Sequence, residues 1–185
     1  KSLRARNYRV LATDCSEYAT GFAFADRGWV VPPAVDPEFV TAIGHVIDQS
    51  RPDFVVPLVD EEIPVLLAMS ASRTPSFRVV APTPEFCALA LDKWLTFQAL
   101  SGAAIPTPRT CLASDPEGMR WPAVLKPRDG RGGREVAYLD SVDALRTHLA
   151  QTRRSPDAFV LQEQILGTEF TVSVVVGLGG PMLGV

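Results

Sequence analysis

The stretch that decides the fold is Pro122–Val136, with the sequence PAVLKPRDGRGGREV. Its apolar beginning, Ala123 to Leu125, is typical of a buried strand. Lys126 closes this strand and can place a compact positive charge in a cleft, where it would bind a phosphate group. The following glycines permit positive φ angles, so that backbone N–H groups can approach phosphate oxygens; they are Gly130, Gly132 and Gly133.

The same residues are also compatible with an ordinary surface loop, because short glycine motifs often occur by chance. The chain contains no GxxxxGK[ST] string, and DGRGGRE lacks the GxGxxG spacing of dinucleotide-binding loops. The segments that accompany this stretch therefore have to decide between a phosphate-binding loop and a plain turn.

Composition limits the classes of function open to the 185-residue chain. Its 18 basic and 21 acidic residues give a net charge of −3 without a block of like charge, which argues against a nucleic-acid partner. No apolar run approaches the length of a membrane span, and the N-terminal residues lack the apolar core of a signal peptide. The 3 cysteines are widely spaced and only 2 histidines are present, so neither a disulfide framework nor a zinc site is expected. We therefore expect a cytoplasmic protein.

The first 82 residues alternate between strand and helix patterns. Short apolar runs predict strands, at 8–12, 54–59 and 77–81. Helices are predicted between the strands, the first with Asp36 as N-cap and Pro37 at its first helical position. This alternation predicts a parallel sheet in a Rossmann-like domain over 1–82, with ligands at the carboxyl ends of the strands.

The second half of the chain has a different pattern. One helix is predicted from about Pro84 to Ser101, with Thr83 as its N-cap, and helix and extended connector together cover 83–112. Over 113–185, paired strands surround one helix, which predicts an α+β, mostly antiparallel unit. The strands are expected at 122–126, 134–139, 158–163 and 169–177, and the helix at 141–151. The fold class expected for the whole chain is α/β plus α+β.

Both ends of the sequence look like interrupted elements. Residues 1–7 are typical of the end of a helix that leads into the first strand. Residues 181–185, with the sequence PMLGV, are typical of the start of a strand. We therefore expect the chain to be part of a longer protein.

Further segments accompany the phosphate-binding stretch in a fixed order. Asp92-Lys93 lies within PTPEFCALALDKWLTFQALSGAAIPTP (82–108), and QEQILGTEFTV (162–172) follows the predicted helix at 141–151. With the αβ segments and the PAVLKP strand, these motifs resemble the ATP-grasp superfamily, in particular its carbamoyl-phosphate-synthase-like, biotin-carboxylase-like and D-alanine–D-alanine-ligase-like members. The likeness covers most of the chain. It implies a Rossmann-like pre-ATP-grasp domain followed by the first lobe of an ATP-grasp domain.

The resemblance implies a role for each matching residue. Lys93 and Lys126 would contact the nucleotide phosphates, and residues 128–134 would form the flexible loop over the triphosphate. Glu163–Leu166 would be the hinge whose backbone groups read the adenine edge, and Glu169 would bind the ribose hydroxyls. The nucleotide-binding residues implied are Lys93, Lys126, Arg128, Gly130, Gly132, Gly133, Glu163, Gln164, Ile165, Leu166 and Glu169.

Taken singly, these residues have plainer interpretations. Lys93 is compatible with a solvated helix face, Glu163 with a strand-end charge, and Glu169 with the outward side of an alternating strand. The cluster Asp60-Glu61-Glu62 also has two interpretations. It can bind an amine, a hydroxyl or an arginine on the substrate side of a cleft, or it can be a helix start whose carboxylates complement the helix dipole.

The function implied by the resemblance is an ADP-forming ligase that activates a carboxylate through an acyl phosphate and joins it to an amine or a thiol. Its ligands would be ATP, Mg²⁺ and a small-molecule carboxylate, with a homodimer as a candidate assembly. The magnesium ligands of such enzymes lie downstream of the EFTV segment, so they are expected beyond Val185, and no catalytic residue is assigned. The alternatives are a non-catalytic nucleotide-binding regulatory or scaffold module and, with less support, a nicotinamide-binding Rossmann domain.

Overall fold

The computed structural model describes residues 3–73, 77–177, 180 and 182–184. These residues fall into two compact units, and each unit has its own hydrophobic core. The first unit comprises Lys1–Thr96 and Asp129–Gly132, and the second comprises Phe97–Arg128 and Gly133–Val185.

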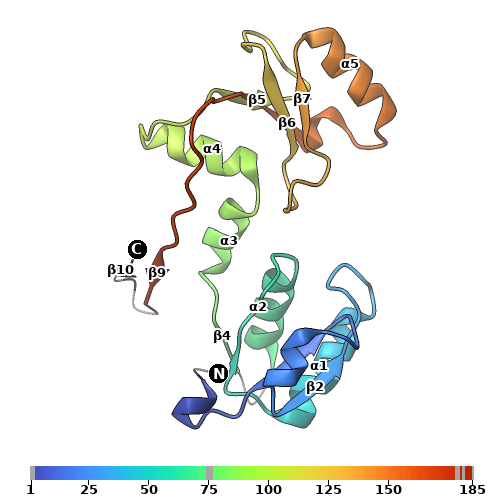
Figure 1. The fold of residues 1–185 in the computed structure, drawn as a ribbon, viewed down its shortest axis with the longest axis vertical. Coiled ribbons are helices and arrows are strands. Elements are labelled where there is room, and N and C mark those ends of the chain that lie inside the picture. The colour runs from blue at the N-terminus through green and yellow to red at the C-terminus, as the bar shows by residue number, and fades with distance from the viewer. Residues whose placement is uncertain (1–2, 74–76, 178–179, 181, 185) are drawn as a thin grey trace. The chain divides into compact units, whose positions relative to one another are not determined.

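The first unit alternates short strands with helices (Figure 1). Its elements are β1 (Leu11–Asp14), β2 (Arg27–Val30), α1 (Phe39–Ser50), β3 (Phe54–Val55), α2 (Glu62–Ser72), β4 (Arg78–Val79) and α3 (Pro84–Ala90), with 3₁₀ helices at Arg4–Arg6 and Thr20–Phe24. β1 pairs with β2, and β3 pairs with β4, both in parallel. The parallel pairing predicted from the alternating pattern is therefore confirmed.

The core of the first unit is built on one face of α1. Phe39, Ile43 and Ile47 follow one another at intervals of four residues, so they lie on the same face of the helix, and all three are buried. Burial of each such side chain contributes about 1.5–3 kcal/mol to stability. The same cluster contains four buried side chains from outside α1: Val31, Leu66, Met69 and Phe77.

In the first unit, one predicted strand is shorter than expected and one strand was not predicted. The apolar run 54–59 forms a ladder only at Phe54–Val55. Pro57 follows this short strand, and because proline has no backbone N–H it cannot donate to a ladder. The sequence pattern also missed β2, which pairs with β1 over Arg27–Val30.

The single helix predicted from Pro84 to Ser101 is also wrong, because the structure has two helices there. Thr83 caps α3 as predicted, with its hydroxyl accepting from the backbone N–H of Phe86. The chain then leaves the helix and re-enters it in α4 (Lys93–Gly102). The Asp92 carboxylate accepts from the backbone N–H groups of Trp94 at 2.8 Å and Leu95 at 3.3 Å, so it caps a new helix.

The second unit contains a four-stranded sheet with the order β5-β8-β6-β7, in which every neighbouring pair is antiparallel. Its elements are β5 (Thr110–Leu112), β6 (Ala123–Pro127), β7 (Ala137–Leu139), α5 (Val142–Gln151), a 3₁₀ helix (Pro156–Ala158), β8 (Phe159–Glu163), β9 (Val175–Val176) and β10 (Met182–Gly184). This arrangement confirms the predicted α+β, antiparallel unit. With the parallel first unit, it also confirms the fold class.

Two parts of the second unit differ from the predictions. The connector predicted before residue 113 includes β5, which pairs with β8 as an edge strand of the sheet. Within the predicted strand 169–177, only Val175–Val176 is a strand, and it pairs with β10. Among the described residues, 169–174 have no strand partner, and an alternating pattern alone does not form a ladder without one.

The core of the second unit lies between α5 and one face of the sheet. Leu125 of β6 and Leu161 of β8 are fully buried there, together with Leu145 of α5. Figure 1 shows α5 beside β6 and β7. Because side chains of a strand alternate between faces, Lys126 lies on the opposite face of the sheet from Leu125. That face carries the polar side chains considered below.

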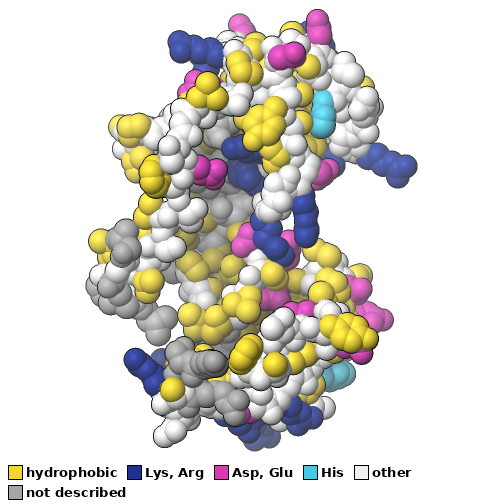
Figure 2. Space-filling model, viewed as in Figure 1, with side chains coloured by type: hydrophobic (Ala, Val, Ile, Leu, Met, Phe, Trp, Pro, Cys, Tyr) yellow, Lys and Arg dark blue, Asp and Glu magenta, His cyan; other side chains and the backbone are white. Residues whose placement is uncertain are grey.

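The surface of the described residues is mixed in charge. On the face drawn in Figure 2, Lys and Arg side chains are interspersed with acidic and hydrophobic ones rather than gathered in one stripe. The exposed hydrophobic side chains include several in 165–176, such as Leu166 at 85% and Phe170 at 81% exposure. No helix among the described residues is long and apolar enough to cross a membrane.

Candidate functional site

Lys126 is held by side chains from two neighbouring strands. Its ammonium group donates to Oε1 of Gln162 at 2.7 Å. Nε2 of Gln162 in turn donates to Oγ1 of Thr110 at 2.9 Å, and the Thr110 hydroxyl donates to the carbonyl of Pro108 at 3.0 Å. A chain of hydrogen bonds therefore runs across β6, β8 and β5 to the segment before the sheet.

Strand register explains why these side chains meet. Gln162 of β8 pairs directly with Thr110 of β5 on one side and with Val124 of β6 on the other. Lys126 lies two residues beyond Val124, so it is a diagonal neighbour of Gln162 on the same face of the sheet. Long side chains reach across such diagonals. The antiparallel sheet thus fixes the backbone of Lys126, and the side-chain amide of Gln162 fixes its ammonium group.

The glycine-rich loop follows β6 directly. Gly130, Gly132 and Gly133 have φ angles of +85°, +67° and +70°, which are left-handed conformations that favour glycine. A Cβ atom built on any of the three would have no neighbour within 4 Å among the described residues. The glycines are therefore required by the course of the backbone and not by close packing.

Arg128 begins this loop at the end of the sheet. Its backbone N–H donates to the carbonyl of Ala158 at 2.9 Å, which extends the β6–β8 ladder by one bond. Its guanidinium group donates to the carbonyl of Asp157 at 3.4 Å. The first residue of the loop is therefore held firmly against β8, while the glycines follow at the exposed tip.

Lys93 and the loop tip meet within the first unit. Lys93 is the first residue of α4 and donates to the carbonyl of Gly130 at 2.9 Å. In the same unit, Nε of Arg131 lies 3.2 Å from a carboxylate oxygen of Glu61. Lys93 belongs to the first unit and Lys126 to the second. Lys93 is hydrogen-bonded to Gly130 of its own unit, and Lys126 to Gln162 of its own unit.

The acidic cluster at 60–62 forms the start of α2, as the helix interpretation predicts. Glu61 stands at the N-cap position and Glu62 is the first helical residue. The Glu62 carboxylate accepts from the backbone N–H of Leu58 at 3.2 Å. The alternative interpretation was that the cluster binds an amine, a hydroxyl or an arginine. Glu61 does pair with an arginine, but this is Arg131 of the same protein.

The predicted hinge begins at the end of β8. The Glu163 carboxylate accepts from the backbone N–H of Arg109 at 2.8 Å, and the Glu163 N–H donates to the Arg109 carbonyl at 2.9 Å. Gln164 donates its backbone N–H to the carbonyl of Pro122 at 3.3 Å. Ile165 and Leu166 are exposed, at 65% and 85%, and Glu169 is exposed in a segment without regular structure.

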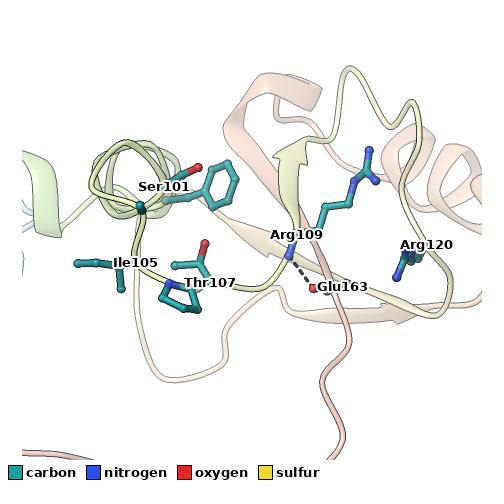
Figure 3. A pocket seen from close by; sticks show the side chains of 9 residues that line it. Ser101, Ile105, Thr107, Arg109, Arg120 and Glu163 are labelled. Atoms are coloured by element: carbon teal, nitrogen blue, oxygen red, sulfur yellow. Dashed lines mark hydrogen bonds between the residues drawn. The ribbon is translucent and has the colours of Figure 1, made fainter.

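A pocket of about 520 Å³ lies beside Glu163 in the second unit (Figure 3). Figure 3 shows Ser101, Ile105 and Thr107 on one side and Arg109, Glu163 and Arg120 on the other, with the bond from Arg109 to Glu163 dashed. Glu163 is the predicted site residue that lines this pocket, whereas Lys126 is not among the lining residues. The pocket therefore lies at Glu163, the first residue of the predicted hinge, and not at the lysine.

The described residues supply no metal cluster, and the thiol on β5 is not activated. They include no group of three or more His, Cys, Asp or Glu side chains that could hold a metal ion. Burial raises the pKa of the Cys111 thiol on β5, Asp115 raises it further, and Arg109 acts in the opposite direction. A raised pKa disfavours the thiolate, which is the nucleophilic form. The side chains around Lys126 offer a ligand charge and hydrogen bonding.

Comparison with known proteins adds the family to this geometry. The family model described as "ATP-grasp domain" matches residues 90–183, half of the chain, and includes the Lys126 strand and the glycine-rich loop. The chain belongs to the ATP-grasp family. The resemblance inferred from the sequence motifs is thereby confirmed. A second model, described as "PylC-like, N-terminal domain", matches residues 1–76.

Individual ATP-grasp proteins match at low to moderate identity. The carbamoyl-phosphate synthase of Methanobrevibacter smithii is 24% identical over 182 residues, which cover 94% of this chain and 47% of that protein. The D-alanine–D-alanine ligase of Ectopseudomonas mendocina is 30% identical over 105 residues, which cover 52% of this chain and 33% of that protein. The chain thus spans about half or less of the length of the curated relatives it matches.

Solved structures show the same fold. The biotin carboxylase domain of the 2-oxoglutarate carboxylase from Hydrogenobacter thermophilus, a dimer in complex with MgADP, ADP and bicarbonate, superposes with a TM-score of 0.68 at 15% identity. The match covers 89% of this chain and 40% of that chain. At this identity the likeness establishes the fold, and the residues of this chain have to support any statement about its ligands.

Several residues that form this site were not among those predicted from the sequence. Gln162 follows the apolar residues FVL of β8 and still lies inside the strand, and a polar residue at such a position is a signal that could have been used. Thr110 could have been found from the same pattern once its strand was recognised. The contact of Glu163 with the backbone of Arg109 has no signal in the sequence, because any residue at 109 other than proline offers the same N–H group.

Proposed function

We propose that the protein is an ATP-dependent ligase that activates a small carboxylate through an acyl phosphate and transfers it to an amine or another nucleophile. The observation that carries this proposal is Lys126: a half-buried ammonium group fixed at the end of a central strand, immediately before a loop with three left-handed glycines. A lysine recognises phosphate as a point charge, and glycine N–H groups can line phosphate oxygens.

The other predicted residues take part in the same proposal. Lys93 would bind the phosphates from α4, and the loop from Arg128 would close over them and exclude water. The backbone of residues 164–166 would recognise the adenine edge, and the Glu169 carboxylate would accept from the ribose hydroxyls. The assignment covers Lys93, Lys126, Arg128, Gly130, Gly132, Gly133, Glu163, Gln164, Ile165, Leu166 and Glu169.

The donor set of the described residues suits a nucleotide. The proposed phosphate ligands are cationic side chains and backbone N–H groups, which match an anionic triphosphate. The described residues offer no cluster of metal-binding side chains. In this proposal magnesium accompanies ATP and lowers its negative charge.

The proposal extends to the organisation of the protein. We propose domain boundaries at 1–82, 83–112 and 113–185, a cytoplasmic location and a homodimer. A dimer would be checked by light scattering of the purified full-length protein. A monomer at all concentrations tested would reject the dimer without affecting the assignment of the nucleotide site.

Replacing Lys126 tests the activity directly. Lys126→Ala in the full-length protein is expected to lower ADP formation with Mg·ATP and a panel of amino acids by about 100-fold or more, because it removes a charge that stabilises the transferred phosphoryl group. Arg146→Ala is the matched control, since Arg146 is 75% exposed on α5 and pairs with Asp143. ADP release by Lys126→Ala at nearly the control rate would reject the ligase proposal. ATP binding by the wild-type protein without ADP formation would favour the non-catalytic nucleotide-binding module.

A further inference from the structure

The hydrogen-bond chain behind Lys126 has a fixed direction. The Pro108 carbonyl can only accept, so the Thr110 hydroxyl donates to it at 3.0 Å and keeps its lone pairs for another donor. That donor is Nε2 of Gln162, at 2.9 Å. The amide oxygen of Gln162 must then face the other way, toward Lys126, at 2.7 Å. Each hydrogen bond thus determines the direction of the next. The Gln162 amide has one orientation in which both of these hydrogen bonds are made.

Burial makes any other orientation of the Gln162 amide costly. Thr110 is 7% exposed, so its hydroxyl depends on protein partners. Gln162 and Lys126 are half-buried. A reversed amide would direct the Gln162 NH₂ group at an ammonium group and leave donors facing donors, which is costly away from water.

The partner of Lys126 is also neutral. An ammonium group has three N–H donors, and the amide oxygen takes one of them. A carboxylate in the same place would cancel the charge of the lysine, whereas an amide orients the group and leaves its charge for another ligand. The arrangement suits a lysine whose charge is used on an anion.

We propose that Gln162 and Thr110 are positioning residues for the Lys126 ammonium group, and that the chain from Pro108 to Lys126 holds it ready for the nucleotide phosphates. This inference rests on the proposed function. A lysine side chain that is already ordered loses less conformational entropy when it binds a phosphate. Removal of these hydrogen bonds is therefore expected to weaken binding of the phosphates and not of the nucleoside.

The first test measures the chain without nucleotide. In ¹⁵N-labelled full-length protein, the side-chain NH₂ resonances of Gln162 are identified by their loss in Gln162→Leu. Thr110→Val is expected to shift them, and Thr110→Ser, which keeps the hydroxyl, is expected to leave them near their original positions. Thr147→Val on the exposed face of α5 is the matched control. If the Gln162 NH₂ resonances have the same positions in Thr110→Val and in the control, the proposed hydrogen bond from Gln162 to Thr110 is overturned.

The second test measures binding of Mg·ATP and of adenosine by calorimetry. Gln162→Leu is expected to raise the Kd for Mg·ATP about tenfold, and Thr110→Val about threefold, because loss of the ordered lysine costs part of its side-chain entropy again. The Kd for adenosine is expected to stay the same. In a Lys126→Met background, Gln162→Leu is expected to have no further effect, since its action passes through the lysine.

The outcomes separate this inference from the function on which it rests. A wild-type protein that binds no Mg·ATP overturns the proposed function and this inference together. A wild-type protein that binds Mg·ATP, with Gln162→Leu binding it equally well, overturns the inference alone. Equal weakening of Mg·ATP and adenosine by Gln162→Leu also overturns it, because that result indicates a structural defect and not loss of lysine positioning. Thermal melting of each variant monitors the fold.

Discussion

Lys126 shows how one side chain acquires a functional environment from its strand. The neighbouring residues Leu125 and Pro127 are buried on the face toward α5, which forces Lys126 to the other face. There it meets a neutral amide at 2.7 Å instead of a carboxylate. A structural ion pair would have placed an acid at this position, so the choice of partner supports a role of the lysine toward an external anion.

Cysteine reactivity tests the structure at the scale of single residues. Burial raises the pKa of Cys87, with a further contribution from Glu85, and burial also raises the pKa of Cys111. Cys15 is exposed. At pH 8, alkylation of Cys87 and Cys111 by iodoacetamide is expected to be on the order of tenfold slower than that of Cys15, because burial limits both access and thiolate formation. Peptide mass spectrometry over time measures the three rates, and equal rates would contradict the burial of Cys87 and Cys111.

At the scale of elements, capping signals were a partial guide to helix starts. Asp36 was predicted as the N-cap of α1, but this helix begins at Phe39 with Glu38 at the N-cap position. Thr83 begins α3 as its pattern predicts, since a hydroxyl before Pro84 is a strong start signal. Asp92 begins a second helix, but the apolar spacing continues across it, so the pattern predicts a single helix. The strand prediction for residues 169–174 was wrong for another reason. An alternating pattern indicates a strand, but it does not show whether a second strand lies beside it to form the hydrogen bonds.

The start of α3 also predicts a pH dependence. The backbone N–H of Glu85 and the hydroxyl of Thr83 bond its carboxylate and hold its pKa below the ordinary value of 4.5. A pKa lowered in the folded state stabilises the protein above the unfolded-state pKa, and this stability is lost as the pH falls through the folded-state pKa. The melting temperature of Glu85→Gln is therefore expected to lie below that of the wild type at pH 7 and to converge with it in acid. Glu17→Gln is the control, and a pH-independent difference for Glu85→Gln would contradict this account.

At the scale of the whole molecule, the sequence was sufficient for the family and the two fold classes but not for the support of the site. Glycine positions, strand patterns and the order of motifs are local signals, and they led to the ATP-grasp family that the matched residues 90–183 establish. The chain from Pro108 through Thr110 and Gln162 depends on register between three strands. Register is a tertiary property, so these contacts became visible only in the structure.

The central claim is that Lys126 binds the phosphate tail of a nucleotide. Calorimetric titration of adenosine, ADP and ATP, the last two with Mg²⁺, into the wild-type protein and Lys126→Met tests it most directly. The wild-type affinity is expected to rise from adenosine to ATP, and Lys126→Met is expected to remove about tenfold or more of that increase while it leaves adenosine unchanged, because a charge-assisted hydrogen bond is lost. Affinities for all three ligands that are the same in Lys126→Met and the wild type would contradict the account.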